Sequence, residues 1–483
     1  MASSNGPRPC VHFLRGSCRF GMRCRFQHDT SATSLPFHHR ESVEANLNKY
    51  KIPSHLVDAS PQLRIMSYNI LADHYAQEHA QELYASVPWA ALEWTSRADM
   101  IAKEVAYWNP DVVCFQEVDH YKHLQALLKP HGYKGVYTQR TGGRPDGLAM
   151  FWRRSRFTAE ALKDLEFAPM DLKDNVCQLT VLRSKEESSI ALLVANIHVL
   201  FNPKRGDIKL AQVRTMLESA HSLVAARPTG PCPVVVCGDF NSAAGSPIYE
   251  FVLRGELQLG SIDRRRLSGQ VEAAGRTGWP SIRGNLFDAM SNGAASEAAA
   301  MQAALGYRSG VIEETVGGGG GGGGDNRDED VMMLPRSASS PAALDRRNSN
   351  SGNANVLTGS AKKFRPWAQD ELEMAAGSES GIARHPLHLE SAYLNVSGSE
   401  PLYTTAHDRY VGTVDYIFYS PQAPTGAEDD SGAIEGQECL TLKPLRVFQP
   451  PPLRTIQTGL PSVMWPSDHL SLIADFVIQQ KQL

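Results

Sequence analysis

The chain has 483 residues, of which 42% are apolar, and it carries a formal net charge of -4. This is enough apolar material for one large or two medium hydrophobic cores, and the balanced charge excludes a uniformly basic protein that coats nucleic acid over its whole surface. The longest apolar stretch, residues 190–201, is shorter than the roughly twenty residues that a membrane span needs, so we expect no membrane partner and a cytoplasmic or nuclear location.

Four potential metal ligands lie close together within residues 1–30. Three thiolates and one imidazole with this spacing satisfy a closed, tetrahedral structural zinc site, and a segment this short could hardly fold without metal. The other cysteines are scattered, which fits a reducing compartment better than a disulfide framework. The predicted Zn²⁺ ligands are Cys10, Cys18, Cys24 and His28, with the spacing C-x7-C-x5-C-x3-H.

This spacing resembles that of CCCH-type zinc fingers, many of which bind single-stranded RNA. In such sites unstacked bases lie against aromatic rings and basic side chains hold phosphates. The corresponding candidates here are the aromatic Phe20 and Phe26 and the basic Arg23 and Arg25. The alternative is a finger used only for protein contacts.

Residues 31–60 are polar without clear periodicity, which predicts a linker, and a larger domain follows over residues 61–480. Short apolar runs of strand length recur there, and one segment carries apolar residues at three- and four-residue spacing, which is typical of a helix. The predicted fold class is therefore mixed α/β. The expected strands are 63–70, 111–118, 147–153, 190–200, 233–240, 387–396, 414–420 and 470–478, and the expected helix is 207–225.

A stretch over residues 263–385 interrupts this domain. It is rich in Ser, Gly, Ala, Asn and Arg, with eight consecutive glycines at 317–324 and an acidic run at 325–330. Such a segment cannot offset the entropy of ordering by burying apolar surface, so we expect a disordered insertion inside one domain. The part from 364 to 375 could instead form a short helix that packs on the domain, or remain a solvated linker.

Polar side chains follow the predicted strands where each strand ends. Asn69, Glu117, His198, Asp239 and Asn241 come after apolar runs, while Asp415 opens one run and Asp468 with His469 precedes another. Each alone could be a turn former or a solvated group. Together they predict a cluster of polar groups at one edge of the sheets.

Phosphodiester hydrolysis explains this set, because it needs a hard cation, an activated water and donors for the charge on phosphate. Carboxylates suit Mg²⁺, and Glu117 is the first candidate ligand. A carboxylate hydrogen-bonded to an imidazole fixes its tautomer and raises its basicity, and His469 with Asp415 could form that pair.

The motifs MSYNILAD, CFQEVD, DGLAMFW, NIHVLFNPKRGDIKLAQV, VVCGDFNS, GTVDYIFYS and PSDHLSL resemble, in order, those of the exonuclease/endonuclease/phosphatase superfamily. The resemblance is to its deadenylase branch, the carbon-catabolite-repressor-type poly(A) nucleases with their Angel and nocturnin relatives. It covers about 300 residues, 61–262 and 387–478, and implies a DNase-I-like four-layer α/β sandwich. It also implies Mg²⁺, for which Mn²⁺ could substitute, held by Glu117, Asn69, Asp239 and Asp468.

The same resemblance implies roles for the remaining polar residues. Asp239 and Asn241 would orient water and phosphate, His198 would contact the phosphate, and His469 would pair with Asp415. In the substrate-facing segment, Asn202 and Pro203 would lie against the nucleotide. Tyr410 corresponds to a base-contacting aromatic of that branch.

The implied function is a Mg²⁺-dependent 3′–5′ exoribonuclease, specific for poly(A), that acts in mRNA turnover with the finger tethering single-stranded mRNA 3′ ends. Three departures bear on this. Thr405 stands where those nucleases have an asparagine that contacts adenine, the loop between Glu117 and Asp146 is shorter, and the leucine-rich repeat that docks such enzymes on a deadenylation complex is absent. The alternatives are a metal-dependent phosphatase of a small dinucleotide cofactor and an inactive RNA-binding scaffold.

Overall fold

The computed structural model describes residue 25 and residues 35–47, 62–270, 366–424, 438–456 and 459–482. All of these except Pro366 belong to one compact unit. The four predicted zinc ligands and residues 271–365 lie outside the described residues. No helix in the described ranges combines the length and apolar character that crossing a membrane requires.

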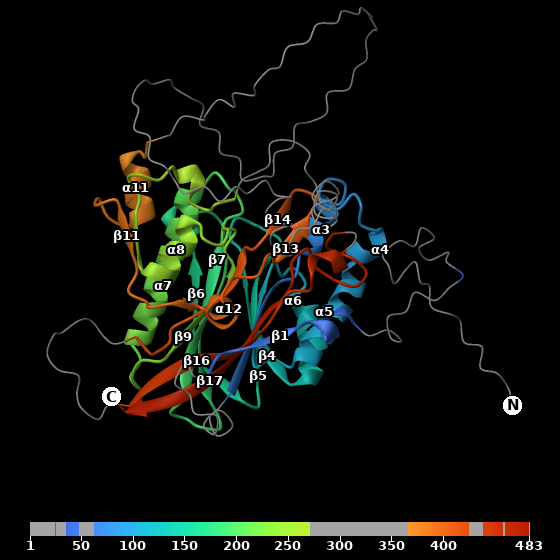
Figure 1. Ribbon diagram of the computed structural model, residues 1–483, viewed down its shortest axis with the longest axis horizontal. Helices are drawn as coiled ribbons and strands as arrows, with labels where there is room; N and C mark the ends of the chain where they lie inside the picture. Colours follow the sequence, from blue (N-terminus) through green and yellow to red (C-terminus); the bar gives the residue numbers. More distant parts are fainter. Residues whose placement is uncertain are drawn as a thin grey trace, which may run out of the picture. The chain divides into compact units, whose positions relative to one another are not determined.

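Two β-sheets form the centre of the unit (Figure 1). Neighbouring strands run antiparallel except for two parallel pairs, β2 with β3 and β8 with β9. The first sheet has the order β1 (Ser42–Glu44), β16 (Glu438–Phe448), β17 (Leu472–Gln482), β2 (Gln62–Asn69), β3 (Val112–Gln116), β5 (Gly147–Arg153), β4 (Tyr133–Gln139). The second has the order β12 (Glu390–Ser391), β15 (Asp415–Tyr419), β9 (Val234–Asp239), β8 (Ala191–His198), β7 (Val176–Ser184), β6 (Phe157–Glu166).

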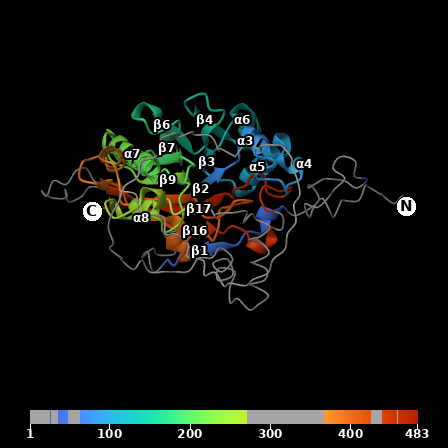
Figure 2. The same ribbon diagram turned by 90° about the horizontal axis from the view of Figure 1, so that it is seen from above.

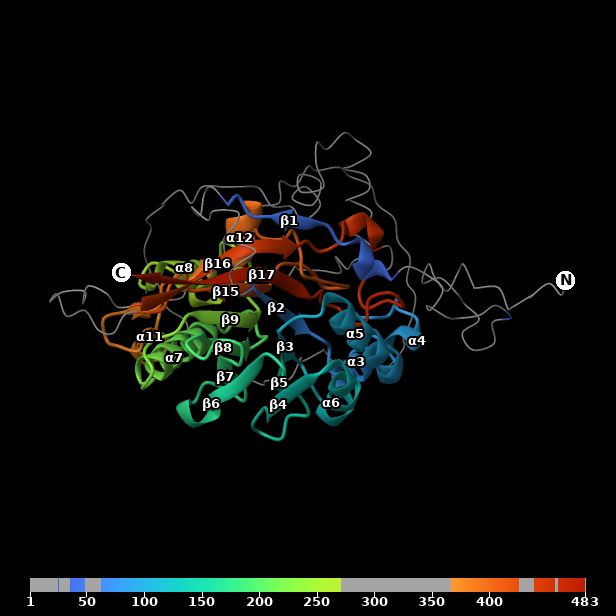
Figure 3. The ribbon, with the colours of Figure 1, turned by 90° about the horizontal axis from the view of Figure 1, so that it is seen from below.

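The sheets pack face to face, and helices cover their outer faces (Figures 2 and 3). Side chains such as Ile65, Cys114, Val194 and Cys237 fill the core between the sheets. The helices α5 (Trp94–Trp108) and α6 (Tyr121–Leu128) cover the first sheet, and α7 (Gly206–Ala225) and α8 (Pro247–Arg254) cover the second. This confirms the predicted four-layer α/β sandwich.

Local sequence explains why several elements begin and end where they do. The strands β3 and β8 are buried on both faces and therefore read as continuous apolar runs. Helix α8 begins at Ser246, whose side chain accepts a hydrogen bond from Tyr249 N, followed by Pro247 at the first helical position. It ends at Gly255, which has a φ of 76° that favours glycine.

The expected strand at 387–396 is wrong. Only β12 (Glu390–Ser391) is a strand there; residues 387–389 before it have no regular structure, and helix α12 (Ala392–Ser397) follows it. The physical reason is a helix cap, because the Ser391 side chain accepts a hydrogen bond from Leu394 N. The other expected strands and the helix at 207–225 are confirmed within a few residues, whereas β4, β6, β7 and β16 were not among them.

The predicted linker 31–60 also needs correction, because residues 35–47 are part of the catalytic unit. After a 3-10 turn at Pro36–His39, β1 pairs with β16 along the edge of the first sheet. Phe37 is fully buried against the outer core of that sheet. Arg40 lies 3.6 Å from the carboxylate of buried Glu104 and donates to Ser471 Oγ at 2.7 Å.

Both ends of the predicted insertion 263–385 are likewise structured. A 3-10 turn at Arg264–Arg266 follows Asp263, and α11 (Gln369–Ala376) packs against α7. Trp367 Nε1 donates to Ile262 O at 2.7 Å, and β11 (Ile382–Arg384) pairs with β10 (Glu256–Gln258). The helix alternative for 364–375 is thus confirmed, because its apolar side chains extend the core beneath α7.

Candidate active site

The parallel pairs bring the predicted polar residues to one end of the sandwich. Asn69 ends β2 and Glu117 follows β3, while His198 ends β8 and Asp239 ends β9. Because carboxyl ends of parallel neighbours share an edge, both sheets present functional groups at the same end. On the antiparallel neighbours, Asp415 opens β15 in register with Asp239, and Asp468 and His469 precede β17.

Asn69 connects two carboxylates that come from different sheets. Its Nδ2 donates to Glu117 Oε1 at 3.0 Å and to Asp239 Oδ2 at 3.1 Å, while its Oδ1 accepts from Leu71 N. The second oxygen of Glu117 accepts from Ala72 N at 3.2 Å. In this arrangement Asn69 positions the two carboxylates, whereas its predicted place at the metal rests on the family resemblance.

Glu117 and Asn241 both have left-handed backbone conformations, with φ of 56° and 45°. Non-glycine residues adopt this region rarely and at a cost, and such residues cluster at functional sites. Gly238, which precedes Asp239 in β9, has no room for a side chain, since a Cβ there would lie 2.1 Å from Ile197 O in β8. The closely spaced backbone of β8 and β9 thus fixes Asp239 beside His198.

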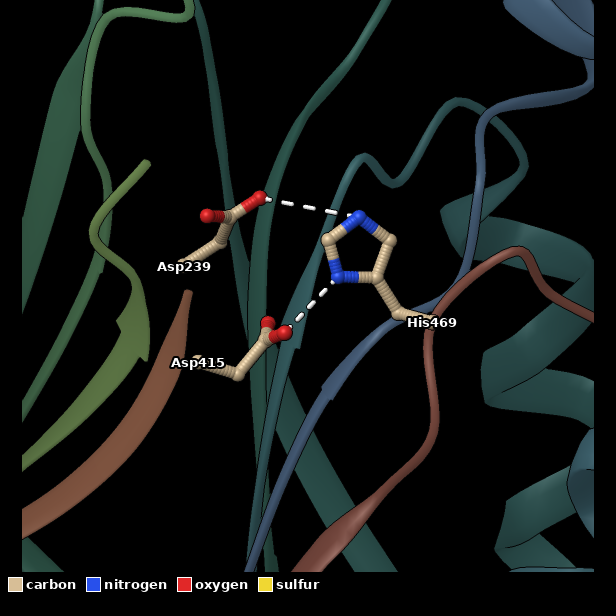
Figure 4. Close-up of side chains that lie close together, drawn as sticks. All are labelled: Asp239, Asp415 and His469. Atoms are coloured by element: carbon tan, nitrogen blue, oxygen red, sulfur yellow. Dashed lines mark hydrogen bonds and ion pairs between the residues drawn. The ribbon is translucent and has the colours of Figure 1, made fainter. Parts of the chain in front are cut away.

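His469 lies between two aspartates (Figure 4). Its Nδ1 is 2.8 Å from Asp415 Oδ2, and its Nε2 is 3.9 Å from Asp239 Oδ2. Burial alone would lower the pKa of His469, but the carboxylates of Asp415, Asp468 and Asp239 outweigh it and hold the pKa well above 6.5. These three residues have the ligand types of a metal site. The short Asp415–imidazole contact and the longer distance to Asp239 also fit a hydrogen-bonded carboxylate–imidazole pair that faces Asp239.

Too little positive charge surrounds the carboxylates at the centre of the site to offset their burial and mutual repulsion. Burial, followed by the repulsion of Asp468 and Asp146, raises the pKa of Glu117 to about 8. Burial and Asp415 raise the pKa of Asp239 to about 7. Carboxylates that repel one another in a buried site fit a bound hard cation, which would hold them ionised. Glu117 and Asp239 are the residues with the best placement to hold it.

Asp468, a predicted metal ligand, already has a protein partner. Its Oδ2 accepts from Tyr84 OH at 2.8 Å, and the backbone carbonyl of the same residue accepts from Thr405 Oγ1 at 2.9 Å. Its negative charge nevertheless helps to raise the pKa of Glu117.

His198 is suited to contact an anion as a neutral group. Burial, and then the cations Arg140 and His469, lower its pKa well below 6.5. Its Nε2 lies 3.5 Å from Asp239 Oδ2, and its buried Nδ1 has no hydrogen-bond partner among the described residues. An incoming phosphate oxygen could satisfy such a group.

The predicted substrate-facing segment is partly exposed. Asn202 and Pro203 are half-buried, and the side chain of Phe201 is 45% exposed. On the other side of the site, Tyr410 is half-buried on β14 (Tyr410–Gly412), which pairs with β13 (Thr405–His407). Thr405 itself is buried, and its hydroxyl is used on the backbone of Asp468.

Sequence reasoning missed three charged residues of the site. Asp146 is fully buried beside Glu117 and accepts from Tyr75 OH at 2.9 Å, and Arg140 lies 3.5 Å from Asp146. Lys209 is fully buried below Asn241. An aspartate directly before the apolar run GLAMFW was a usable signal for Asp146. Lys209 looked like one more polar residue of helix α7.

Comparison with known proteins decides the family. Residues 66–469 match the model of the endonuclease/exonuclease/phosphatase family, and residues 8–29 match a CCCH-type zinc finger. The chain belongs to the endonuclease/exonuclease/phosphatase family. Members are typically dependent on a divalent metal, in agreement with the carboxylate cluster.

Relatives within this family support the branch expected from the motifs. The chain is 32% identical over 433 residues to carbon catabolite repressor protein 4 homolog 3 of Arabidopsis thaliana, covering 87% of this chain and 76% of that protein. It is 30% identical over 431 residues to human protein angel homolog 2, covering 86% and 69%. Among solved structures, ANGEL2, described as a 2′,3′-cyclic phosphatase, matches with a TM-score of 0.58 at 27% identity, covering 92% of this chain and 99% of that one.

Proposed function

We propose that the chain is a Mg²⁺-dependent hydrolase of phosphodiester bonds at RNA 3′ ends, with Mn²⁺ able to substitute. The observation that carries the proposal is the buried carboxylate of Asp239, which lies between the imidazolium of His469 and the amide of Asn69 and beside Glu117. This is a combination of cation ligands and a positioned imidazole at one end of the sandwich.

The residues divide the work by their charge. A bound divalent cation would neutralise phosphoryl oxygen charge, with Glu117 and Asp239 as its nearest carboxylates. His469 is positioned by the carboxylate of Asp415 and can donate to a phosphate oxygen as negative charge develops. Asp239 would help to hold the cation and, together with Asn241, would orient the attacking water and the phosphate.

Two features favour RNA over a small soluble substrate. The match of residues 8–29 to a CCCH-type zinc finger supports a second RNA-binding module in the same chain. The exposed ring of Phe201 follows the strand that carries His198, where a base could stack on it. For the same reason we rank the dinucleotide phosphatase below RNA hydrolysis. The inactive scaffold ranks lowest, because every predicted catalytic side chain is present and clustered.

The first substrate candidate is the poly(A) tail of mRNA, degraded 3′ to 5′. It is supported by the likeness to the carbon catabolite repressor protein 4 homologs. This likeness does not imply stable membership of a deadenylation complex, because the leucine-rich repeat that docks such enzymes is not part of this sequence.

The second candidate is an RNA end that carries a 2′,3′-cyclic phosphate, and one observation favours it. The hydroxyl of Thr405 is buried and bonded to Asp468 O, so it offers nothing to an adenine base. Recognition that depends on ribose and phosphate would not need that contact. The likeness to ANGEL2, described as a 2′,3′-cyclic phosphatase, points the same way.

One matrix of substrates tests both candidates. RNAs labelled at the 5′ end and ending in A, U or C tracts would each be made with a 3′-hydroxyl or a 2′,3′-cyclic phosphate and incubated with Mg²⁺ or with chelator. Stepwise shortening of A tracts alone would support the poly(A) nuclease, and opening of the cyclic end regardless of base would support the second candidate. No Mg²⁺-dependent change in any RNA, with turnover of a dinucleotide cofactor, would overturn the proposal.

A further inference from the structure

A buried lysine contacts the backbone of the predicted catalytic residue Asn241. Lys209 in α7 is fully buried, and its ammonium donates to Asn241 O at 2.6 Å and to Gln270 Oε1 at 2.7 Å. Both acceptors are neutral carbonyl oxygens. Because burying an ammonium without a directly bonded carboxylate costs free energy, such a group is uncommon where packing alone decides the residue.

Asn241 is held at three points. Its backbone N donates to Asp239 Oδ1 at 2.8 Å, its Nδ2 donates to Val199 O at 2.9 Å, and its carbonyl oxygen accepts from Lys209. The residue has a φ of 45°, a conformation that needs support from its surroundings. The Lys209 hydrogen bond therefore helps to fix Asn241. The backbone N–H of Asn241 contacts Asp239, and its side-chain amide contacts Val199, the residue after His198.

The other partner of Lys209 belongs to the segment where the insertion begins. Ser268 O accepts from Ala243 N at 2.7 Å, and Leu267 O accepts from Ile248 N at 3.1 Å, so the segment is bonded to the loop that follows Asn241. On its other side it packs on the substrate-facing loop, since a Cβ on Gly206 would lie 2.2 Å from Arg264 O.

We propose that Lys209 and Gln270 are positioning residues for the reaction, and that the segment from Arg264 to Gln270 is a built part of the active site through which the insertion joins the catalytic Asn241. The expected kinetic effect rests on the proposed hydrolase function. The hydrogen bonds that run from Gln270 through Lys209 to Asn241, hereafter the brace, are a property of the fold itself. Gln270 orients the ammonium, the ammonium fixes Asn241, and Asn241 in turn holds the Asp239 carboxylate.

Two variants test the brace kinetically. Lys209→Met keeps the length of the side chain but removes both hydrogen bonds, and kcat should fall on the order of 10²-fold because small displacements of reacting groups are costly. Gln270→Leu should lower kcat about tenfold, the effect of one hydrogen bond. KM should be nearly unchanged in both variants. Gln270→Glu keeps the acceptor and should retain kcat, and Gln125→Leu on the exposed face of α6 is a matched control that should have no effect.

Stability and exchange measurements separate positioning from folding. Met leaves Asn241 O without its donor, so the melting temperature of Lys209→Met should fall modestly; the loss of kcat should persist well below the melting temperature, whereas a purely structural residue would lower activity only in proportion to the fraction unfolded. Amide hydrogen exchange over residues 239–246 should be faster in Lys209→Met and Gln270→Leu than in the unaltered protein. This readout needs no turnover, so absence of hydrolysis in the unaltered protein would refute the proposed function without deciding the brace. Unchanged exchange and unchanged kcat in both variants would overturn the brace. So would kcat losses that Gln270→Glu shares equally.

Discussion

The Nε2 atom of His469 lies 3.9 Å from Oδ2 of Asp239, and the far side of the same imidazole is bonded to Asp415 at 2.8 Å. The three residues come from different places in the chain, yet the register of β15 against β9 places Asp415 directly opposite Asp239. The sheet therefore sets the distance between the protonated imidazole and the carboxylate that it faces.

Replacing His469 with Gln should lower kcat about 10²–10⁴-fold, the usual contribution of a positioned proton donor or acceptor. KM should change little, because the developing charge on phosphate is absent in the ground state. Steady-state kinetics on the preferred RNA measures both constants. Asp415→Asn is the companion variant and should lower kcat less, since the imidazole remains. A change confined to KM would contradict the assigned role.

The raised carboxyl pKa values predict how stability depends on pH and metal. A carboxyl group whose pKa is raised by folding, as for Glu117 to about 8 and Asp239 to about 7, stabilises the fold below its ordinary pKa. That contribution is lost as the pH rises through the folded value. Metal-free protein should therefore melt at lower temperature near pH 8 than near about pH 5.5. Mg²⁺ should raise the melting temperature more at the higher pH, because it favours the ionised carboxylates.

Thermal melts with Mg²⁺ or chelator across this pH range measure the effect. The shift caused by Mg²⁺ should shrink in Glu117→Gln, and a shift that is equal at both pH values would refute the metal assignment.

Two deletions distinguish the structured ends of the insertion from its middle. Joining residue 270 to residue 366 with a short linker should preserve folding and kcat, because loop-closure entropy depends only weakly on length. Removing about residues 265 to 380 instead takes away α11, which packs on α7, and the segment that carries Gln270. The larger deletion should lower thermal stability and kcat together. Soluble expression, melting temperature and kcat of both proteins settle the comparison, and equal behaviour of the two deletions would contradict it.

The finger is expected to act on capture of RNA and not on chemistry. Replacing Cys24 with Ser removes a predicted zinc ligand and should unfold the module. Apparent affinity for long RNA should then fall and its salt dependence should become shallower, while kcat/KM on a di- or trinucleotide stays nearly unchanged. Only six residues separate His28 from the described stretch 35–47. Equal losses on short and long RNA would show that the finger shapes the catalytic site. No loss on either would favour protein contacts.

The strand ends could be predicted from sequence because buried parallel strands are continuous apolar runs, as in VVCFQ before Glu117 and VVVCG before Asp239. The contacts between the two sheets could not be predicted. The hydrogen bonds of Asn69 to Glu117 and Asp239, and the register of Asp415 against Asp239, depend on tertiary packing. Arg40 shows a second limit. It lies in a polar, aperiodic stretch, and its partners Glu104 and Ser471, 64 and 431 residues further along, explain its place. Lys209 carried no signal beyond its helix, since its partners lie 32 and 61 residues away.

If the carboxylate cluster holds a cation for phosphodiester hydrolysis, activity should depend on the negative charge of Glu117, which Glu117→Gln removes. Glutamine keeps the size of the side chain and an oxygen that can accept from Ala72 N, but removes the negative charge. Single-turnover hydrolysis of the preferred RNA should require Mg²⁺ in the unaltered protein and fall on the order of 10³-fold or more in the variant, with the fold intact by thermal melting. Full Mg²⁺-dependent activity in Glu117→Gln would contradict the account.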